Sequence, residues 1–367
     1  MKKIFFMAQL PPPHHGASIV NNYIYKNNKI KDKFKTKFLN ISPANEMNEV
    51  GKVSIKKVLK TLSMFIKSIK TQILFKPNLV YITLSPHGPA FFKDSFLVLL
   101  QKIFGTKICI HLHGKGIQNE IDKSFLKMLY YKLVFNRTHV IHLSSKLIFD
   151  IERLIPVNKV HIVNNGVEDY KVSIKDDQKV KINFLYLSNF VPEKGAHTLI
   201  DSLKYIPSEY HDMFNLTLAG KFTDQEYKNI ILKKIDNNSS IEINLHEGLY
   251  EDDKKNALNK CDVFVLPTYF KNECFPLSIL EAMSANSAII STNEGAISDF
   301  VIHDTNGFIV EQENAFELSK AIIKLIKSDD LLSKFKSKSR DLYNKNYNLD
   351  IFENKLIKTL TNIMEEN

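Results

Sequence analysis

The 367-residue sequence has only three cysteines and no uncharged apolar run of about 18 residues. Because such a run is needed to cross a bilayer, we predict no membrane-spanning helix. Cys109, Cys261 and Cys274 lack C-x-x-C spacing and lie in apolar segments. This predicts neither a zinc site nor a disulfide framework, and it fits a reducing cytoplasm. The chain exceeds the length that one core usually supports, so we expect two domains.

Acidic residues are scarce in the first half of the chain. Residues 1–180 contain 29 Lys and Arg against 12 Asp and Glu, a net charge of +17, whereas residues 181–367 contain 21 against 28, a net charge of −7. The segment 52–77, KVSIKKVLKTLSMFIKSIKTQILFKP, carries seven lysines, no acid, and apolar residues at helical spacing. Such a helix can lie on anionic lipid, or it can be a domain helix with a solvated lysine face. We predict no nucleic-acid partner, because zinc-finger spacing, RNA-binding aromatic motifs and glycine-rich arms are all missing.

Short apolar segments alternate with helical segments along the whole chain. In the first half, the predicted strands are KKIFFMAQL, LVYITLS, KICIHLHG, HVIHLS and KVHIVNNG. In the second half, they are INFLYLSNF, FNLTLAG, SIEINLHEG, DVFVLPT, SAIIST and GFIV. This alternation predicts an α/β protein with two Rossmann-like, doubly wound parallel sheets that face a central cleft.

The predicted domain boundaries follow from this pattern. Residues 1–170 form the first domain, the polar run 171–181 is a linker, and residues 182–345 form the second domain. Residues 346–367 form a last helix that could pack back against the first domain. The first domain is the candidate acceptor-binding domain, and the second is the candidate nucleotide-sugar-binding domain.

The segment 271–286, KNECFPLSILEAMSAN, places Glu273 and Glu281 eight residues apart. Pro276 suits the first turn of a helix, and an apolar stripe follows it, so Glu273 is expected just before the helix and Glu281 inside it. Eight residues at helical rise span about 12 Å, the reach between a ribose and the sugar of a nucleotide diphosphate sugar. The helix N-terminus would then face the phosphates. The alternative is a capped surface helix with solvated acids.

Three segments together carry a resemblance to a known family. The run 266–310 combines the two glutamates with an EAM helix, a strand ending in Ser-Thr, a Gly turn and an Asn-Gly-Phe strand. It resembles the donor-binding signature of the retaining family 4 glycosyltransferases, which have the GT-B fold. Residues 185–203, LYLSNFVPEKGAHTLIDSL, resemble the phosphate loop of that family, and PPPHHGAS resembles its first strand-to-helix loop.

The resemblance implies roles for individual residues. The implied catalytic residues are His113, near the donor sugar, Lys194, on the β-phosphate, and Glu273, on hydroxyls of the hexose. Glu281 would bind the ribose hydroxyls, where an ionised bidentate acceptor is suitable. His111, two residues before His113, is either a core histidine or the true match. The other implied donor-binding residues are Gly16, Asn189, Lys221, Gly248, Leu249, Tyr250, Cys274, Phe275, Pro276, Leu277 and Ser278.

Three of these positions depart from the family pattern. Asn189 stands where an arginine is usual, so one cation near the phosphates is missing. Lys221 replaces a usual acidic residue and could supply a compensating charge. Cys274 replaces a frequent glycine, and we interpret it as a small packed side chain rather than a nucleophile.

The resemblance also implies a chemistry. The expected reaction is transfer of a hexose or N-acetylhexosamine from a UDP-linked donor with retention of anomeric configuration, without metal or cofactor, because no D-x-D follows a strand. The expected acceptor is a lipid-linked saccharide of bacterial O-antigen, capsule or exopolysaccharide. The protein would then be cytoplasmic and bound peripherally to the anionic inner face of the membrane. The alternatives are a UDP-sugar epimerase of the same fold and a non-catalytic sugar-nucleotide or membrane-binding scaffold.

Overall fold

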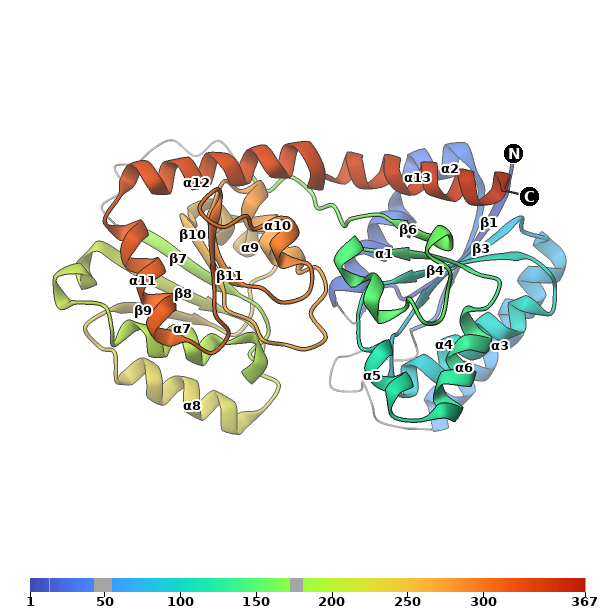
Figure 1. Ribbon diagram of the computed structural model, residues 1–367, viewed down its shortest axis with the longest axis horizontal. Helices are drawn as coiled ribbons and strands as arrows, with labels where there is room; N and C mark the ends of the chain where they lie inside the picture. The colour runs from blue at the N-terminus through green and yellow to red at the C-terminus, as the bar shows by residue number, and fades with distance from the viewer. Residues whose placement is uncertain (13, 43–54, 172–180, 367) are drawn as a thin grey trace. The chain divides into compact units, whose positions relative to one another are not determined.

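The computed structural model describes residues 1–12, 14–42, 55–171 and 181–366, with side chains from residue 59 onward in the helix that begins at Ile55. The chain divides into two compact units (Figure 1). Unit 1 comprises Met1–Asn165 and Asp350–Asn367, and unit 2 comprises Gly166–Leu349. Most of the predicted linker 171–181 and the start of the lysine-rich segment 52–77 lie outside the described residues.

Unit 1 contains a six-stranded sheet in the order β2-β1-β3-β4-β5-β6. All of its strand pairs are parallel. The strands are β1 (Lys3–Ala8), β2 (Lys35–Asn40), β3 (Leu79–Leu84), β4 (Lys107–Leu112), β5 (His139–His142) and β6 (Val160–Ile162). Every residue of β3 is buried, because helices cover both faces of a parallel sheet and its inner strands are therefore apolar without alternation.

The helices of unit 1 follow the strands in the expected alternation. They are α1 (Gly16–Lys26), α2 (Asn28–Lys33), α3 (Ile55–Phe75), α4 (Gly88–Lys102), α5 (Ile117–Asp122) and α6 (Phe125–Phe135), with a 3₁₀ turn at Ser145–Asp150. Helix α4 contacts both α3 and α6. These three helices therefore form one continuous layer on the sheet.

Unit 2 repeats the architecture, with a parallel sheet in the order β12-β11-β10-β7-β8-β9. Its strands are β7 (Ile182–Leu187), β8 (Phe214–Ala219), β9 (Glu242–His246), β10 (Val263–Leu266), β11 (Ala288–Thr292) and β12 (Gly307–Val310). Its helices are α7 (Ala196–Leu203), α8 (Gln225–Asp236), α9 (Glu251–Lys260), α10 (Leu277–Ser284), α11 (Ala315–Ile326) and α12 (Asp329–Leu342). Figure 1 shows α9, α10 and α12 on one side of this sheet and α7, α8 and α11 on the other.

The predicted fold class of two doubly wound parallel sheets is confirmed. All eleven predicted strand segments contain a strand, and the structure adds β2, which the sequence analysis did not identify. This strand, KTKFLN, lies at the edge of the sheet and has no fully buried residue. Its lysines suit an edge strand, and they hide the apolar pattern that identifies inner strands.

The last helix, α13 (Leu349–Glu365), belongs mainly to unit 1 although it follows unit 2 in the chain. Lys29 of α2 pairs with Asp350 at its start (2.6 Å), and Lys159 pairs with Glu366 just after its end (2.6 Å). Leu356, Leu360 and Ile363 are buried. None of the helices that the structure describes is long and apolar enough to span a bilayer.

Candidate functional site

The candidate donor site in unit 2 is built around α10, which follows β10 after a ten-residue loop. Seven of the eight residues of α10 are buried, and one of these is Glu281. A buried carboxylate needs a partner. Lys254 of α9 donates a hydrogen bond to Glu281 Oε1 at 2.7 Å, and the hydroxyl of Tyr170 donates to the same oxygen at 3.4 Å. Glu281 is therefore a fixed anion and not the solvated surface acid of the alternative interpretation.

Glu273 lies in the loop before α10 and forms an ion pair with Lys194. Both side chains are largely shielded from water, with 10% and 17% of their surfaces exposed. The Lys194 ammonium also lies 4.8 Å from the centre of the Phe270 ring. The structure thus brings together an acid and a base that are 79 residues apart in the chain.

The backbone around this ion pair is held by two glycines. Gly195 has a φ of +77°, and a Cβ added to it would lie 2.2 Å from the carbonyl oxygen of Pro267. Gly295 has a φ of +59°, and its Cβ would lie 2.4 Å from the carbonyl oxygen of Glu273. Only glycine combines this conformation with such close approach. The loops after β7, β10 and β11 are therefore packed against one another at the carboxyl edge of the sheet, where open parallel sheets bind ligands.

The N-terminus of α10 has no side-chain cap. Pro276 was expected in the first turn, but the helix begins at Leu277, and Pro276 precedes it as the N-cap residue with a φ of −65°. Uncapped N–H groups in the first turn, together with the helix dipole, can bind an anion. Of the residues around this turn, Cys274 and Phe275 are buried, and Ser278 is half-buried.

The other predicted residues of unit 2 lie on loops after neighbouring strands. Asn189 follows β7 and is exposed, and Lys221 follows β8 with its ammonium 5.4 Å from the centre of the Tyr250 ring. Gly248 has a φ of +110°, and a Cβ there would lie 2.5 Å from the Tyr250 hydroxyl. Leu249 is half-buried. These residues share the carboxyl side of strands β7, β8 and β9.

The predicted histidines of unit 1 differ in their surroundings. His111 is buried in β4 and hydrogen-bonds to the hydroxyl of Tyr81 through Nδ1. His113 follows the strand, and both of its ring nitrogens are buried without a hydrogen-bond partner. The two rings lie 4.0 Å apart between centroids. Unsatisfied buried nitrogens carry a desolvation cost, and His111 Nε2 is also buried without a partner, so His113 has two ring nitrogens to offer a ligand and His111 has one.

Other polar groups at the same edge were not singled out from sequence as site residues. His142 Nε2, at the end of β5, and Asn165 Oδ1, after β6, are also buried and unpaired. Their positions at the carboxyl ends of β5 and β6, on the same sheet edge as His113, are the signal that could have identified them. Gly16 is the first residue of α1, and a Cβ added to it would meet no atom within 4 Å. Packing within the described chain thus gives no reason for this glycine.

These histidines are neutral at neutral pH. Burial, and to a smaller extent the nearby His15 and His142, lower the pKa of His113 to about 3. Burial alone lowers the pKa of His142 to about 3. Neutral imidazoles can donate and accept hydrogen bonds to sugar hydroxyls without adding charge.

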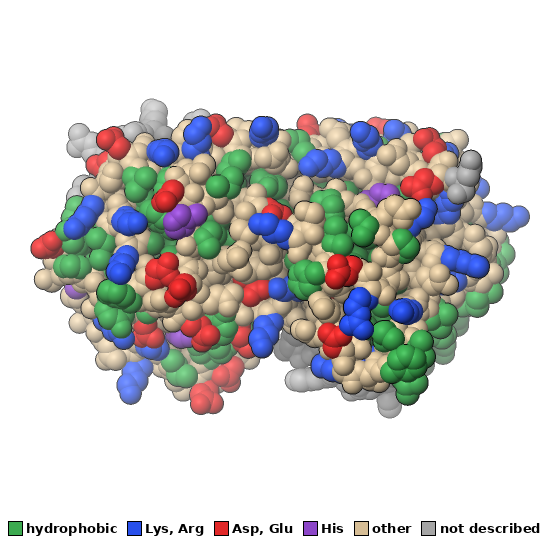
Figure 2. Space-filling view, in the orientation of Figure 1, with side chains coloured by type: hydrophobic (Ala, Val, Ile, Leu, Met, Phe, Trp, Pro, Cys, Tyr) green, Lys and Arg blue, Asp and Glu red, His purple; other side chains and the backbone are tan. Residues whose placement is uncertain are grey.

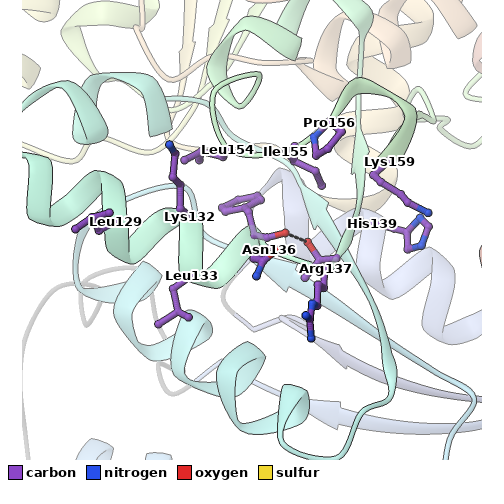
Figure 3. A pocket seen from close by; sticks show the side chains of 12 residues that line it. Leu129, Lys132, Leu133, Asn136, Arg137, His139, Leu154, Ile155, Pro156 and Lys159 are labelled. Atoms are coloured by element: carbon purple, nitrogen blue, oxygen red, sulfur yellow. Dashed lines mark hydrogen bonds between the residues drawn. The ribbon is translucent and has the colours of Figure 1, made fainter.

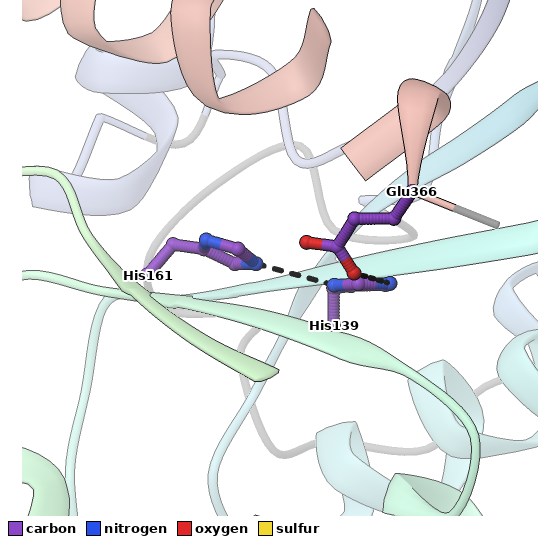
Figure 4. Close-up of side chains that lie close together, drawn as sticks. All are labelled: His139, His161 and Glu366. Atoms are coloured by element: carbon purple, nitrogen blue, oxygen red, sulfur yellow. Dashed lines mark hydrogen bonds and ion pairs between the residues drawn. The ribbon is translucent and has the colours of Figure 1, made fainter. Parts of the chain in front are cut away.

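A further cluster of possible metal ligands consists of His139, His161 and Glu366 (Figure 4). His139 Nδ1 and His161 Nε2 lie 3.2 Å apart, and His139 Nε2 lies 3.7 Å from a Glu366 carboxylate oxygen. That oxygen already accepts from Lys159, and the Glu366 carbonyl accepts from Lys107. Since lysines already balance the carboxylate, we interpret the cluster as a clamp that holds the end of α13 on β5 and β6.

Comparison with known proteins shows what this chain is similar to. Residues 168–342, all within unit 2, match the family described as Glycosyl transferases group 1. The capsular polysaccharide biosynthesis glycosyltransferase CapM of Staphylococcus aureus is 26% identical over 59% of this chain and 60% of its own length. The UDP-Gal:alpha-D-GlcNAc-diphosphoundecaprenol alpha-1,3-galactosyltransferase of Escherichia coli is 27% identical over 65% of this chain and 64% of its own length. The matched stretches thus span less than two thirds of either relative.

Among solved structures, the Anabaena protein Alr3699/HepE in complex with UDP superimposes with a TM-score of 0.75 and 18% identity. The superposition covers 99% of this chain and 100% of that protein. The chain therefore has the GT-B fold of glycosyltransferase structures.

Proposed function

We propose that this protein is a glycosyltransferase that moves a hexose or N-acetylhexosamine from a UDP-linked donor to a lipid-linked saccharide during assembly of a bacterial surface polysaccharide. The observation that carries the proposal is the pair of buried, cation-paired carboxylates around the uncapped N-terminus of α10. They lie within the stretch that matches the Glycosyl transferases group 1 family. The name of the S. aureus relative supports a role in polysaccharide assembly.

In this proposal the donor lies along α10. Glu281 accepts hydrogen bonds from the ribose hydroxyls, and Lys194 and the first N–H groups of α10 bind the diphosphate. Glu273 accepts hydrogen bonds from hydroxyls of the transferred sugar. The existing ion pairs support these assignments, because Lys254 and Lys194 hold the two carboxylates in place before the donor arrives. The exposed Asn189 supplies no positive charge, so Lys194 is the main cation for the β-phosphate.

The proposed chemistry is front-face substitution with retention and without a metal ion. The bond between the anomeric carbon and the diphosphate oxygen breaks, and the acceptor oxygen forms a bond to the same face of that carbon. The acceptor proton passes to the departing phosphate oxygen. Lys194 and the α10 N-terminus stabilise the charge that develops on this oxygen. His113, neutral and unpaired, is proposed to hydrogen-bond the transferred sugar.

The proposed acceptor is a saccharide linked through a diphosphate to a lipid. The first half of the chain carries a net charge of +17, which suits an anionic acceptor and an anionic membrane surface. The E. coli relative is named for a diphosphoundecaprenol-linked acceptor and a UDP-galactose donor. We accordingly propose that the protein acts at the cytoplasmic face of the membrane without spanning it.

A calorimetric titration with UDP, GDP and their common sugar conjugates tests the donor site. We expect one nucleotide to bind and Glu281→Ala to weaken it by roughly 10- to 150-fold, the effect of losing hydrogen bonds to a charged group. Glu226→Ala, an exposed acid in the first turn of α8, is the matched control and should bind like the wild type. Equal binding by wild type and Glu281→Ala would refute the assignment, and an inverted product linkage by NMR would refute retention.

A further inference from the structure

The layer formed by α3, α4 and α6 exposes an unusual number of large apolar side chains. Of the 25 large apolar side chains that are exposed among the described residues, 13 lie on these helices or directly after α4. They are Leu59, Leu62, Ile66, Ile73, Leu74, Phe92, Phe96, Ile103, Phe104, Phe125, Leu126, Leu129 and Leu133. Figure 2 shows hydrophobic side chains gathered over this part of unit 1. Such a concentration on one face marks an interaction surface, because the outer face of a domain helix is normally polar.

The charges on this layer have one sign. The three helices contain nine lysines and a single acid, Asp94. Asp94 is fully buried and pairs with Lys93. The nearest acids on the adjoining helix, Glu120 and Asp122, pair with Lys123, Lys127 and Arg153. The layer therefore presents apolar and positive groups without an exposed carboxylate of its own.

A cavity of about 760 Å³ adjoins the layer at the end of α6 (Figure 3). Leu129 and Leu133 belong both to the apolar layer and to the cavity wall. Figure 3 shows Leu129, Lys132 and Leu133 projecting from α6, with His139 and Lys159 on the opposite side. Arg137, in the turn after α6, also lines the cavity.

Positive charge is in excess at the cavity. Lys159 is neutralised by Glu366 (2.6 Å), whereas Lys132 and Arg137 are exposed. Lys102 donates hydrogen bonds to the carbonyls of Leu133 (2.5 Å) and Asn136 (2.6 Å), two residues that line the cavity. Burial and the charge of Arg137 lower the pKa of Lys102 to about 8. An anion in the cavity would relieve this repulsion between cations.

We propose that the α3–α4–α6 layer docks on an anionic phospholipid bilayer and that the adjoining cavity receives a lipid phosphate. Exposed Phe and Leu side chains would enter the interface, and the lysines would contact the headgroups. A second copy of the chain is a poorer occupant, because two such faces would bring lysines against lysines. The inference deepens the proposed function and rests on it in one respect, since a lipid-linked acceptor lies in a membrane.

Sedimentation with vesicles tests the layer. The full-length protein is mixed with vesicles of phosphatidylcholine alone or of phosphatidylcholine with phosphatidylglycerol. We expect binding to the anionic vesicles, weakened by salt, and at least about tenfold weaker binding for the double variant Phe125→Ser/Leu126→Ser. These side chains are 67% and 75% exposed, so the variant should fold. Phe316→Ser, on α11 and 51% exposed, is the matched control.

A second pair of variants tests the cavity. Lys132→Glu/Arg137→Glu should weaken binding to anionic vesicles, whereas Lys334→Glu, an exposed lysine of α12, should bind like the wild type. Equal binding to both kinds of vesicle, or no effect of either double variant, would overturn the proposal. So would a dimer that Phe125→Ser/Leu126→Ser dissociates, since the face would then belong to a second copy. A titration of the wild-type protein with UDP in the absence of vesicles separates the two proposals. If the protein binds anionic vesicles but does not bind UDP, the proposed function is refuted and the docking surface stands.

Discussion

Replacing Glu273 by glutamine should separate binding of the nucleotide from binding of the sugar. In the unliganded chain the Glu273 carboxylate forms an ion pair with Lys194, and both side chains are mostly shielded from water. In the proposed complex a phosphate shares this ammonium. Glu273 therefore competes with the diphosphate for Lys194 while it provides acceptors for the hydroxyls of the sugar.

The expected size of the effect follows from the charges. A phosphate oxygen that shares Lys194 would lie about 5 Å from the carboxylate, where two negative charges repel by roughly 3 kcal/mol at an effective dielectric of about 20. Partial exposure and salt reduce this value. We therefore expect Glu273→Gln to bind UDP at least about threefold more tightly than the wild type. The same variant loses charged hydrogen bonds to the sugar, so turnover of the sugar conjugate should fall by at least about tenfold.

The assay is calorimetric titration with UDP, together with a measurement of product formation. Lys194→Met is the complementary variant and should weaken UDP binding by roughly 10- to 150-fold. The double variant Glu273→Gln/Lys194→Met should bind UDP more tightly than Lys194→Met alone, because the repulsion between the Glu273 carboxylate and the diphosphate does not need Lys194. Thermal unfolding of each variant checks that the fold is retained. Weaker UDP binding by Glu273→Gln would refute this reasoning, since it would mean that the carboxylate supports the nucleotide itself.

Two further predictions concern stability. Because His113 and His142 have folded-state pKa values of about 3 and an unfolded pKa near 6.5, only the unfolded chain takes up these protons as the pH falls through 6.5. Stability should therefore decrease towards low pH, by roughly 2 kcal/mol per histidine at pH 5. Denaturant unfolding at pH 7.5 and pH 5 measures this, and His142→Gln should show a smaller loss; an unchanged loss would contradict the assignment. In the second case, Gly195→Ala should lower the melting temperature by several degrees, because a Cβ there meets the Pro267 carbonyl oxygen at 2.2 Å with φ at +77°. Gly16→Ala, which meets no atom within 4 Å, is the control, and equal melting temperatures for the two variants would disprove the strain.

Much of the fold could be predicted from local patterns in the sequence. Inner strands such as LVYITL are continuous apolar runs bounded by turns, and their alternation with helical segments determines a doubly wound parallel sheet. The segment around Glu273 and Glu281 identified a helix with an acid before it and another inside it, and the structure places that helix one residue later than Pro276 suggested. Strand β2 was missed because its alternating lysines resemble a surface segment.

Only the tertiary structure decided which distant residues meet. Glu281 is held by Lys254 and Tyr170, 27 and 111 residues away, and Glu273 by Lys194. Sequence could not tell how many ring nitrogens of His111 and His113 lack partners, because both residues lie near the end of one strand and only packing places the Tyr81 hydroxyl on His111 Nδ1. The exposed face of α6 was likewise not foreseen, since apolar spacing on a helix does not say which side the sheet covers. Periodicity and turns are properties of neighbouring residues and can be read from the sequence. The pairings, by contrast, depend on which distant segments the order of the strands in the sheet brings side by side.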